Sequence, residues 1–136
     1  MCLSMGEGLM IEVVNMHHCR NFGKHGDFRC DRETKWGNPF IMYEQKMRDR
    51  VCDLYEDYLD AIIEPDNQQI VRNMLKIGGL TPTQVNMWME KTRGFLDINE
   101  LKGAKRLFCW CKPSRCHCDY LAKKIEQNTK QGFLNV

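Results

Sequence analysis

The residues best suited to chemistry lie in one short segment near the carboxyl end of the chain. Four of the eight cysteines fall within ten residues there, in the run Cys109-Trp110-Cys111-Lys112-Pro113-Ser114-Arg115-Cys116-His117-Cys118-Asp119. Thiols, an imidazole and a carboxylate in such proximity can bind a metal ion, or can supply a nucleophile together with proton carriers. Both interpretations of this segment are open from the sequence.

In the first interpretation the segment binds zinc, which takes four soft ligands in a tetrahedron. Cys109, Cys111, Cys116 and His117 would supply that number, with Cys118 as an alternative to the histidine. The spacing is less typical, because structural zinc sites usually use C-x2–4-C pairs and these pairs are C-x-C. On a strand the two cysteines of the first pair would stand about 6.6 Å apart, which is wide for two ligands of one ion. Without a metal ion, we expect Cys109 to belong to the core and Cys118 to be incidental.

The second interpretation places a reactive thiol at the start of a helix. Ser114 is a good N-cap residue, so Cys116 would lie in the first helical turn. Unpaired N–H groups and the helix dipole at that position lower the pKa of a thiol and attract anions. Cys116 is then the candidate nucleophile, with His117 and Asp119 as candidate proton carriers. Asp119 could equally serve only to stabilise the helix N-terminus.

A second group of candidate residues belongs to the stretch from residue 16 to 40, which has no clear period and is rich in polar, aromatic and glycine residues. So long an irregular stretch in a compact domain is typical of a functional loop. We expect it to bind a ligand together with the end of the first strand and the cysteine-rich turn. The candidate ligand-binding residues are Asn15, Arg20, Trp36, Asn38, Phe40, Cys111, Ser114 and Arg115. Structural roles are the alternative, because Asn38 can hold a turn and the two aromatic rings can seal the loop onto the core.

The elements that must position these residues can be predicted from hydrophobic periodicity and from cap residues. Residues 11–15 and 106–111 are short, apolar and rich in β-branched or aromatic side chains, which predicts two buried strands. Asp66 with Gln69 forms a capping-box pattern, and Thr81 is followed by Pro82 and Gln84. We expect helical segments at residues 44–63, from 66 to a stop at Gly78-Gly79, from Thr81 onward, at 97–101 and at 115–127.

Strands that are distant in sequence and joined through helices favour parallel pairing. We therefore expect an α/β fold, a small Rossmann-like three-layer domain with a short parallel sheet and several helices. Residues 1–10 would form a flexible N-terminal extension, residues 11–128 a single α/β domain and residues 129–136 a C-terminal tail.

The composition is ordinary for one globular domain, with 136 residues of which 43% are hydrophobic and 28% charged. No apolar run is long enough to span a membrane, and a basic leader of the secretory type is missing. We therefore expect a cytoplasmic protein, in which clustered thiols indicate metal binding or catalysis more often than disulfides.

The net charge of the chain is +2, which does not by itself indicate that the protein binds nucleic acid. Residues 102–136 carry eight Lys or Arg against two acids, which could attract a phosphate or polynucleotide or could be a solvated helix face.

Three motifs of this chain match the pattern of one family. They are Val13-Val14-Asn15, Lys35-Trp36-Gly37-Asn38-Pro39-Phe40, and Leu107-x-Cys109-Trp110-Cys111-Lys112-Pro113-x-x-Cys116-His117-x-Asp119. Over about residues 11–126 the chain resembles the domain-of-unknown-function family numbered 4326, which is common in bacteriophage genomes. The resemblance implies a phage-type α/β domain that acts in the host cytoplasm, and it implies no particular reaction. The family tends to have glycine at the position of Cys118, which argues against a four-cysteine zinc site. It also tends to carry an Ile-Gly-Arg-like element where this chain has residues 25–30.

Three functional hypotheses follow. The leading one is a domain that binds a nucleotide, nucleoside or nucleobase-like ligand between residues 15–40 and the turn at 111–119, with a thiol-dependent transferase or glycosidic-bond activity as its sharper form. The competing one is a non-enzymatic, zinc-stabilised interaction module that acts on a host protein or nucleic acid. The third is a sensor that binds a nucleotide without transforming it. None of them requires a membrane.

Overall fold

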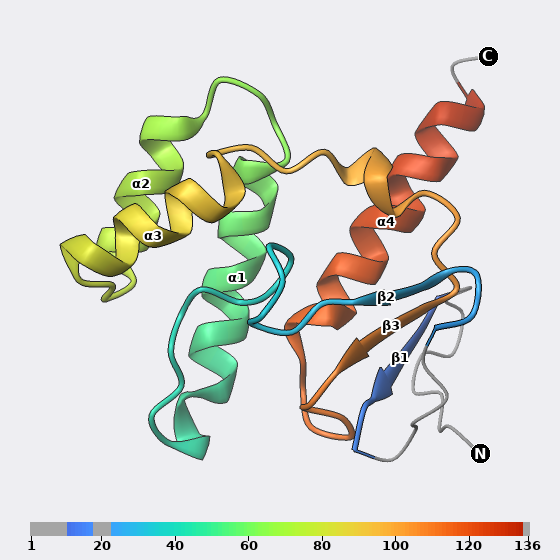
Figure 1. Ribbon diagram of the computed structural model, residues 1–136, viewed down its shortest axis with the longest axis horizontal. Coiled ribbons are helices and arrows are strands. Elements are labelled where there is room, and N and C mark those ends of the chain that lie inside the picture. Colours follow the sequence, from blue (N-terminus) through green and yellow to red (C-terminus); the bar gives the residue numbers. More distant parts are fainter. Residues whose placement is uncertain (1–10, 18–22, 135–136) are drawn as a thin grey trace.

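A three-stranded parallel sheet and four α-helices form the described part of the chain (Figure 1). The structure is a computed structural model that describes residues 11–17 and 23–134, with side chains up to residue 129. The expectations for residues 1–10 and for Arg20 lie outside the described residues. The α/β fold with a short parallel sheet is confirmed. Among the described residues no helix combines the length and apolarity that a membrane span requires.

The sheet has the order β1-β3-β2, so the strand that is last in sequence lies in the centre. β1 (Glu12–Asn15) and β2 (Asp27–Arg29) both pair in parallel with β3 (Arg106–Cys109). β2 lies inside the stretch that the sequence predicts to be irregular, because three residues are too few to show a period. The Arg106 guanidinium donates to both carboxylate oxygens of Asp27, at 2.8 and 2.6 Å, which ties this edge strand to the centre and lowers the pKa of Asp27.

The predicted second strand ends at Cys109 rather than at residue 111. Asn15 is the last residue of β1 and lies opposite Cys109, and the N–H of Met16 donates to the Cys109 carbonyl at 2.7 Å. Beyond this bond β1 offers no further ladder partner, and the chain after Cys109 leaves the sheet in a turn.

Alternate residues of the sheet face opposite sides. Val13, Leu107 and Cys109 belong to the main core with the helices, whereas Val14 and Phe108 form a small cluster with Met16 on the other side. α4 (His117–Leu134) packs on β1 and β3, and α1 (Arg48–Ile62) packs on α4. α2 (Gln68–Ile77) and α3 (Pro82–Thr92) form a pair against α1, farther from the sheet (Figure 1).

Most helix predictions agree with the structure, and the differences lie at helix ends. α4 starts at His117 rather than at 115 and continues to Leu134 rather than ending at 127, so it extends into the residues expected to form the C-terminal tail. The segment predicted at 44–63 is a short 3₁₀ helix, η1 (Gln45–Met47), followed by α1. The capping box of Thr81 and Gln84 is present, and the predicted turn at 97–101 is the 3₁₀ helix η2 (Ile98–Leu101). The capping box predicted at Asp66 is wrong, because this residue has a φ of 71° and α2 starts only after Asn67.

The segment from Trp36 to Phe40 is buried against α1. The Asn38 side chain donates to the Val51 carbonyl at 2.9 Å and accepts from the backbone N–H of Phe40 at 3.0 Å. The Tyr55 hydroxyl donates to the Trp36 carbonyl at 2.9 Å. These contacts are those of the structural alternative that the sequence leaves open for Trp36, Asn38 and Phe40.

We predict that Gly37→Ala destabilises the domain. A Cβ atom at this position would lie 2.6 Å from the Cα atom of Arg32 and closer still to the Asp31 carbonyl, and backbone atoms cannot rotate away as a side chain can. The free energy of unfolding should fall by about 1–3 kcal/mol in urea denaturation. Thr83→Ala, at an exposed position of α3, is the control and should change little. An unchanged midpoint for Gly37→Ala would contradict this packing.

Candidate metal centre

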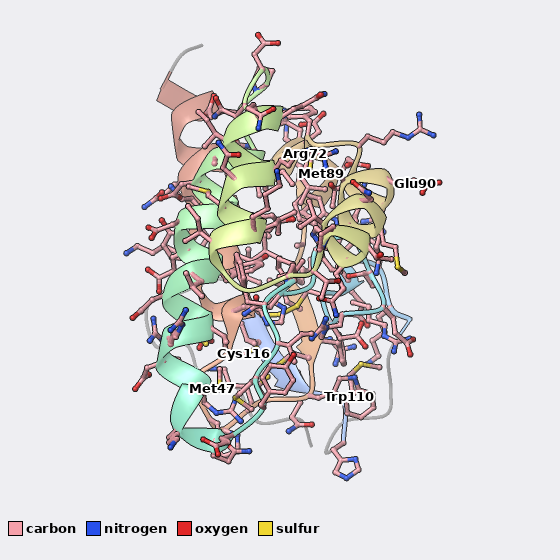
Figure 2. All side chains as sticks on the ribbon, turned by 90° about the vertical axis from the view of Figure 1, so that its left-hand side faces the viewer. Met47, Arg72, Met89, Glu90, Trp110 and Cys116 are labelled. Atoms are coloured by element: carbon pink, nitrogen blue, oxygen red, sulfur yellow. A yellow bond between two sulfur atoms is a disulfide. The ribbon has the colours of Figure 1, made fainter. Side chains whose placement is uncertain are left out.

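Cysteine and histidine side chains meet at the carboxyl edge of the sheet. The parallel strands all end at this edge, and three parts of the chain contribute: the residue after β2, the end of β3 with its turn, and the start of α4. We call the group the thiol cluster; its members are Cys30, Cys109, Cys111, Cys116, His117 and Cys118. Cys116 lies between α1 and the strands, whereas Trp110 lies at the rim of the molecule (Figure 2).

The thiol cluster contains three overlapping sets of residues that could hold a metal ion, each with its ligand atoms within 4.8 Å of one another. Two of the sets include Cys118, which forms a disulfide with Cys30. A sulfur in a disulfide is no thiolate ligand. The set of free groups is therefore Cys111, Cys116 and His117. The free thiol of Cys109 lies near Cys116, with which it shares one of the other two sets.

The disulfide corrects two expectations. Cys118 is not incidental, since it joins the start of α4 to the end of β2. The disulfide also corrects the expectation that the cysteines are reduced, because Cys30 and Cys118 are oxidised. Sequence reasoning missed Cys30 as a site residue, because β2 was not recognised. Had this strand been predicted, the position of Cys30 directly after it would have indicated a site residue at the carboxyl edge of the sheet.

Cys116, and not Ser114, caps α4. Its sulfur accepts from the N–H of Cys118 at 3.4 Å, and its own N–H donates to the Asp119 carboxylate at 3.2 Å. The N–H of Ser114 instead donates to the Cys111 carbonyl at 2.9 Å, inside the preceding turn. Asp119 also forms an ion pair with Lys112 at 2.5 Å, so this carboxylate fastens the turn to the helix start. That is the structural role which the sequence left open for Asp119.

The imidazole of His117 has one fixed orientation. Its Nε2 lies 2.5 Å from the Cys30 carbonyl oxygen, and its Nδ1 lies 3.8 Å from the Cys116 sulfur. A carbonyl can only accept, so Nε2 carries the hydrogen and Nδ1 presents its lone pair to the thiols. The side chain is buried, and burial lowers the pKa of His117, which keeps the ring neutral. A neutral ring held from its far nitrogen by a backbone carbonyl is the usual state of a metal-binding histidine.

The pKa values of the three free thiols in the cluster are shifted in opposite directions. Hydrogen bonds from Cys109 and Cys116 lower the pKa of the Cys111 thiol to about 2. The contact with Cys111 raises the pKa of Cys109. The pKa of Cys116 is raised well above its usual value, mainly by its contact with Cys109 and then by its contact with Cys111. Cys116 is also only 2% exposed, whereas Cys111 is half-buried. The thiolate character therefore lies on Cys111, and the nucleophilic role of Cys116 stays a prediction.

Two other predicted ligand-binding residues hold the turn in place. The Asn15 side chain donates to the carbonyls of Trp110 and Lys112, on either side of Cys111, and its role in ligand binding stays a prediction. Arg115 pairs with three acids of α1 at distances of 2.7 to 3.1 Å, and these are Asp49, Asp53 and Glu56. Ser114 is exposed on the turn.

Asp31 is a further site residue that sequence reasoning missed. It follows Cys30, is buried, and accepts from the indole Nε1 of Trp110 at 3.0 Å and from Arg29 at 2.7 Å. The Trp110 ring is thereby held in place although it is 51% exposed. The carboxyl edge thus presents a fixed aromatic ring on the residue before Cys111.

A comparison with protein families identifies the family of this chain. A family model described as "Domain of unknown function (DUF4326)" matches residues 14–127. No curated protein and no solved structure matches significantly.

We predict that Asn15→Ala loosens the turn around Cys111. The substitution leaves the carbonyls of Trp110 and Lys112 without this donor, which should lower the free energy of unfolding by about 1–3 kcal/mol. The native protein should also react faster with a thiol reagent at Cys111. Asn73→Ala, which removes an exposed asparagine from α2, is the matched control for urea denaturation and thiol titration. Equal stability and reactivity in both variants would show that Asn15 does not hold the turn.

Proposed function

The chain belongs to the family described as Domain of unknown function (DUF4326), and from its site we propose that the domain is a zinc-stabilised interaction module. The observation that carries the proposal is the orientation of His117. Its Nε2 hydrogen is used by the Cys30 carbonyl, so Nδ1 is available as a ligand on the side of the free thiols.

The donor set fits zinc better than a hard cation. Cys109, Cys111, Cys116 and His117 would offer three sulfurs and one nitrogen, and thiolate with imidazole is a typical zinc set. Cys111, Cys116 and His117 have their ligand atoms within 4.8 Å of one another, and Cys109 shares a second set with Cys116. The proposal takes Cys109 as the fourth ligand, which would close the site as in structural zinc centres. The ion would join the end of β3 to the start of α4 and would add folding free energy.

In this proposal the turn between β3 and α4 makes the contact with a partner. It carries the half-exposed ring of Trp110, which Asp31 holds by its indole nitrogen. Buried or half-buried tryptophans are frequent anchors of interfaces. The proposal that the protein is phage-encoded and acts on a host protein or nucleic acid in the host cytoplasm rests on the family resemblance alone.

We predict about one zinc ion per chain in protein purified without an affinity tag. Cys111→Ser should lose most of this metal, and its melting temperature should no longer respond to a chelator. Cys52→Ser is the matched control, because Cys52 is a buried free thiol outside the thiol cluster. Metal analysis by mass spectrometry and thermal denaturation with and without chelator provide the test. A Cys111→Ser protein that keeps its full zinc content would refute the assignment.

A second candidate function is favoured by one observation. Cys111 is a half-buried thiol with a lowered pKa at the carboxyl edge of a parallel sheet, which is where open α/β sheets bind ligands. We propose, as the alternative, binding of a nucleotide, nucleoside or nucleobase-like ligand beside Trp110, with or without thiol-dependent chemistry. In this case Cys111 would replace Cys116 as the nucleophile.

Thiol titration of the native protein separates the two functions. The alternative predicts that one thiol reacts with iodoacetamide far faster than the others near neutral pH, and that Cys111→Ser removes this phase while Cys52→Ser retains it. The zinc-stabilised module predicts that the thiols of the cluster stay protected until a chelator is added. Fast labelling of metal-free protein at Cys116 instead would contradict the arrangement described here for both functions.

A further inference from the structure

Two neighbouring hollows lie between the segment 39–43, α1 and α3. Their volumes are about 360 and 220 Å³, and Ile41 and Leu80 line both, so the two hollows adjoin as a two-part groove. We call it the α1–α3 groove. None of its lining residues belongs to the thiol cluster. Its apolar lining includes Pro39, Ile41, Val51, Leu54, Leu80 and Trp88.

The charges in the groove are all positive. Arg32, Arg50 and Lys91 are its charged lining residues. The positive charge of the groove contrasts with the net negative charge of residues 41–101, which hold eleven acids against seven bases. Neither arginine forms an ion pair within the described residues. The two guanidinium groups are therefore available to carboxylates of a partner.

The backbone of residues 41–43, of which Ile41 and Tyr43 line the groove, is also available for hydrogen bonds. Within the described part of the chain, no hydrogen bond uses a backbone group of Ile41, Met42 or Tyr43, and these residues lie in neither helix nor strand. Unpaired N–H and C=O groups beside an apolar groove are what an added peptide strand requires. Tyr43 and Met87 stand at the groove with 75% and 64% of their surface exposed. Exposed methionine adapts readily to a partner's side chains.

We propose that the α1–α3 groove binds an acidic, apolar peptide segment of a partner protein in an extended conformation. Alternate apolar side chains of the peptide enter the two hollows, its carboxylates pair with Arg32 and Arg50, and its backbone pairs with residues 41–43. A protein segment fits better than a nucleic acid because the lining is mainly apolar. That the partner is a protein rests on the proposed function as an interaction module. The groove itself is separate from the proposed metal centre, because none of the proposed metal ligands lines it.

The test uses an eight-residue peptide that alternates leucine with glutamate, titrated into isotope-labelled full-length protein. We expect NMR shift changes at the amides of residues 41–43 and at the Trp88 indole, with little change at Trp110. The double charge reversal Arg32→Glu with Arg50→Glu should weaken binding by about tenfold or more. The matched control, Lys76→Glu with Lys102→Glu, reverses two exposed cations outside the groove and should leave the affinity unchanged.

Two further probes make the outcome decisive. A peptide with N-methyl groups at alternate residues should lose most of the affinity, since it cannot donate to the wall of the groove. Equal binding of a leucine–lysine peptide, shifts centred on Trp110, or tighter binding of a single-stranded oligonucleotide at the groove would each overturn the proposal. Zinc content is measured on every sample, so loss of metal tests the metal centre while loss of peptide binding with metal retained tests the groove.

Discussion

The hydrogen bond between His117 and the Cys30 carbonyl connects the parts of the chain on which the site depends. Cys30 follows the edge strand β2, and His117 is the first residue of α4, so two elements far apart in sequence meet at one 2.5 Å contact. The contact decides which imidazole nitrogen carries a hydrogen and therefore which nitrogen can bind a metal ion. The Cys30–Cys118 disulfide fixes the same two elements a second time. The orientation of His117 is thus set by the fold and not by a metal ion.

Polar side chains hold the turn between β3 and α4 from several sides. Asn15 binds it from β1, Asp119 binds it from α4, and Arg115 joins it to the acids of α1. Residues that sequence reasoning assigned to a ligand or to proton transfer thereby position the thiols. A short turn rich in carbonyl groups needs such donors, since it lies outside any regular hydrogen-bond ladder. Asn15, Asp119 and Arg115 are in this sense positioning residues for Cys111 and Cys116.

The sequence was sufficient to predict features that depend on local pattern. The apolar stripe of α1, the capping box at Thr81 and the parallel pairing of residues 11–15 with the strand at 106 all follow from spacing and connectivity. The features that it did not predict depend on contacts between distant residues. β2 is only three residues long and is held by Asp27 and Arg106, which are 79 positions apart, and the disulfide of Cys118 depends on where β2 ends. The cap of α4 was misplaced at Ser114 because a cysteine sulfur served as the acceptor.

Helix α1 connects the two regions to which function is assigned here. Arg48 donates to the Arg115 carbonyl at 3.1 Å, and Tyr55 contacts the His117 ring edge-on, so one side of α1 supports the candidate metal centre. Arg50, Val51 and Leu54 of the same helix line the α1–α3 groove. A helix is a rigid element, and side chains three or four residues apart share one face. Arg50 and Leu54 therefore lie on the face toward the groove, whereas Val51 lies between them and the face that carries Arg48 and Tyr55. The hydrogen bond from Arg48 to Arg115 therefore links the turn of the candidate metal centre to the helix that forms one wall of the groove.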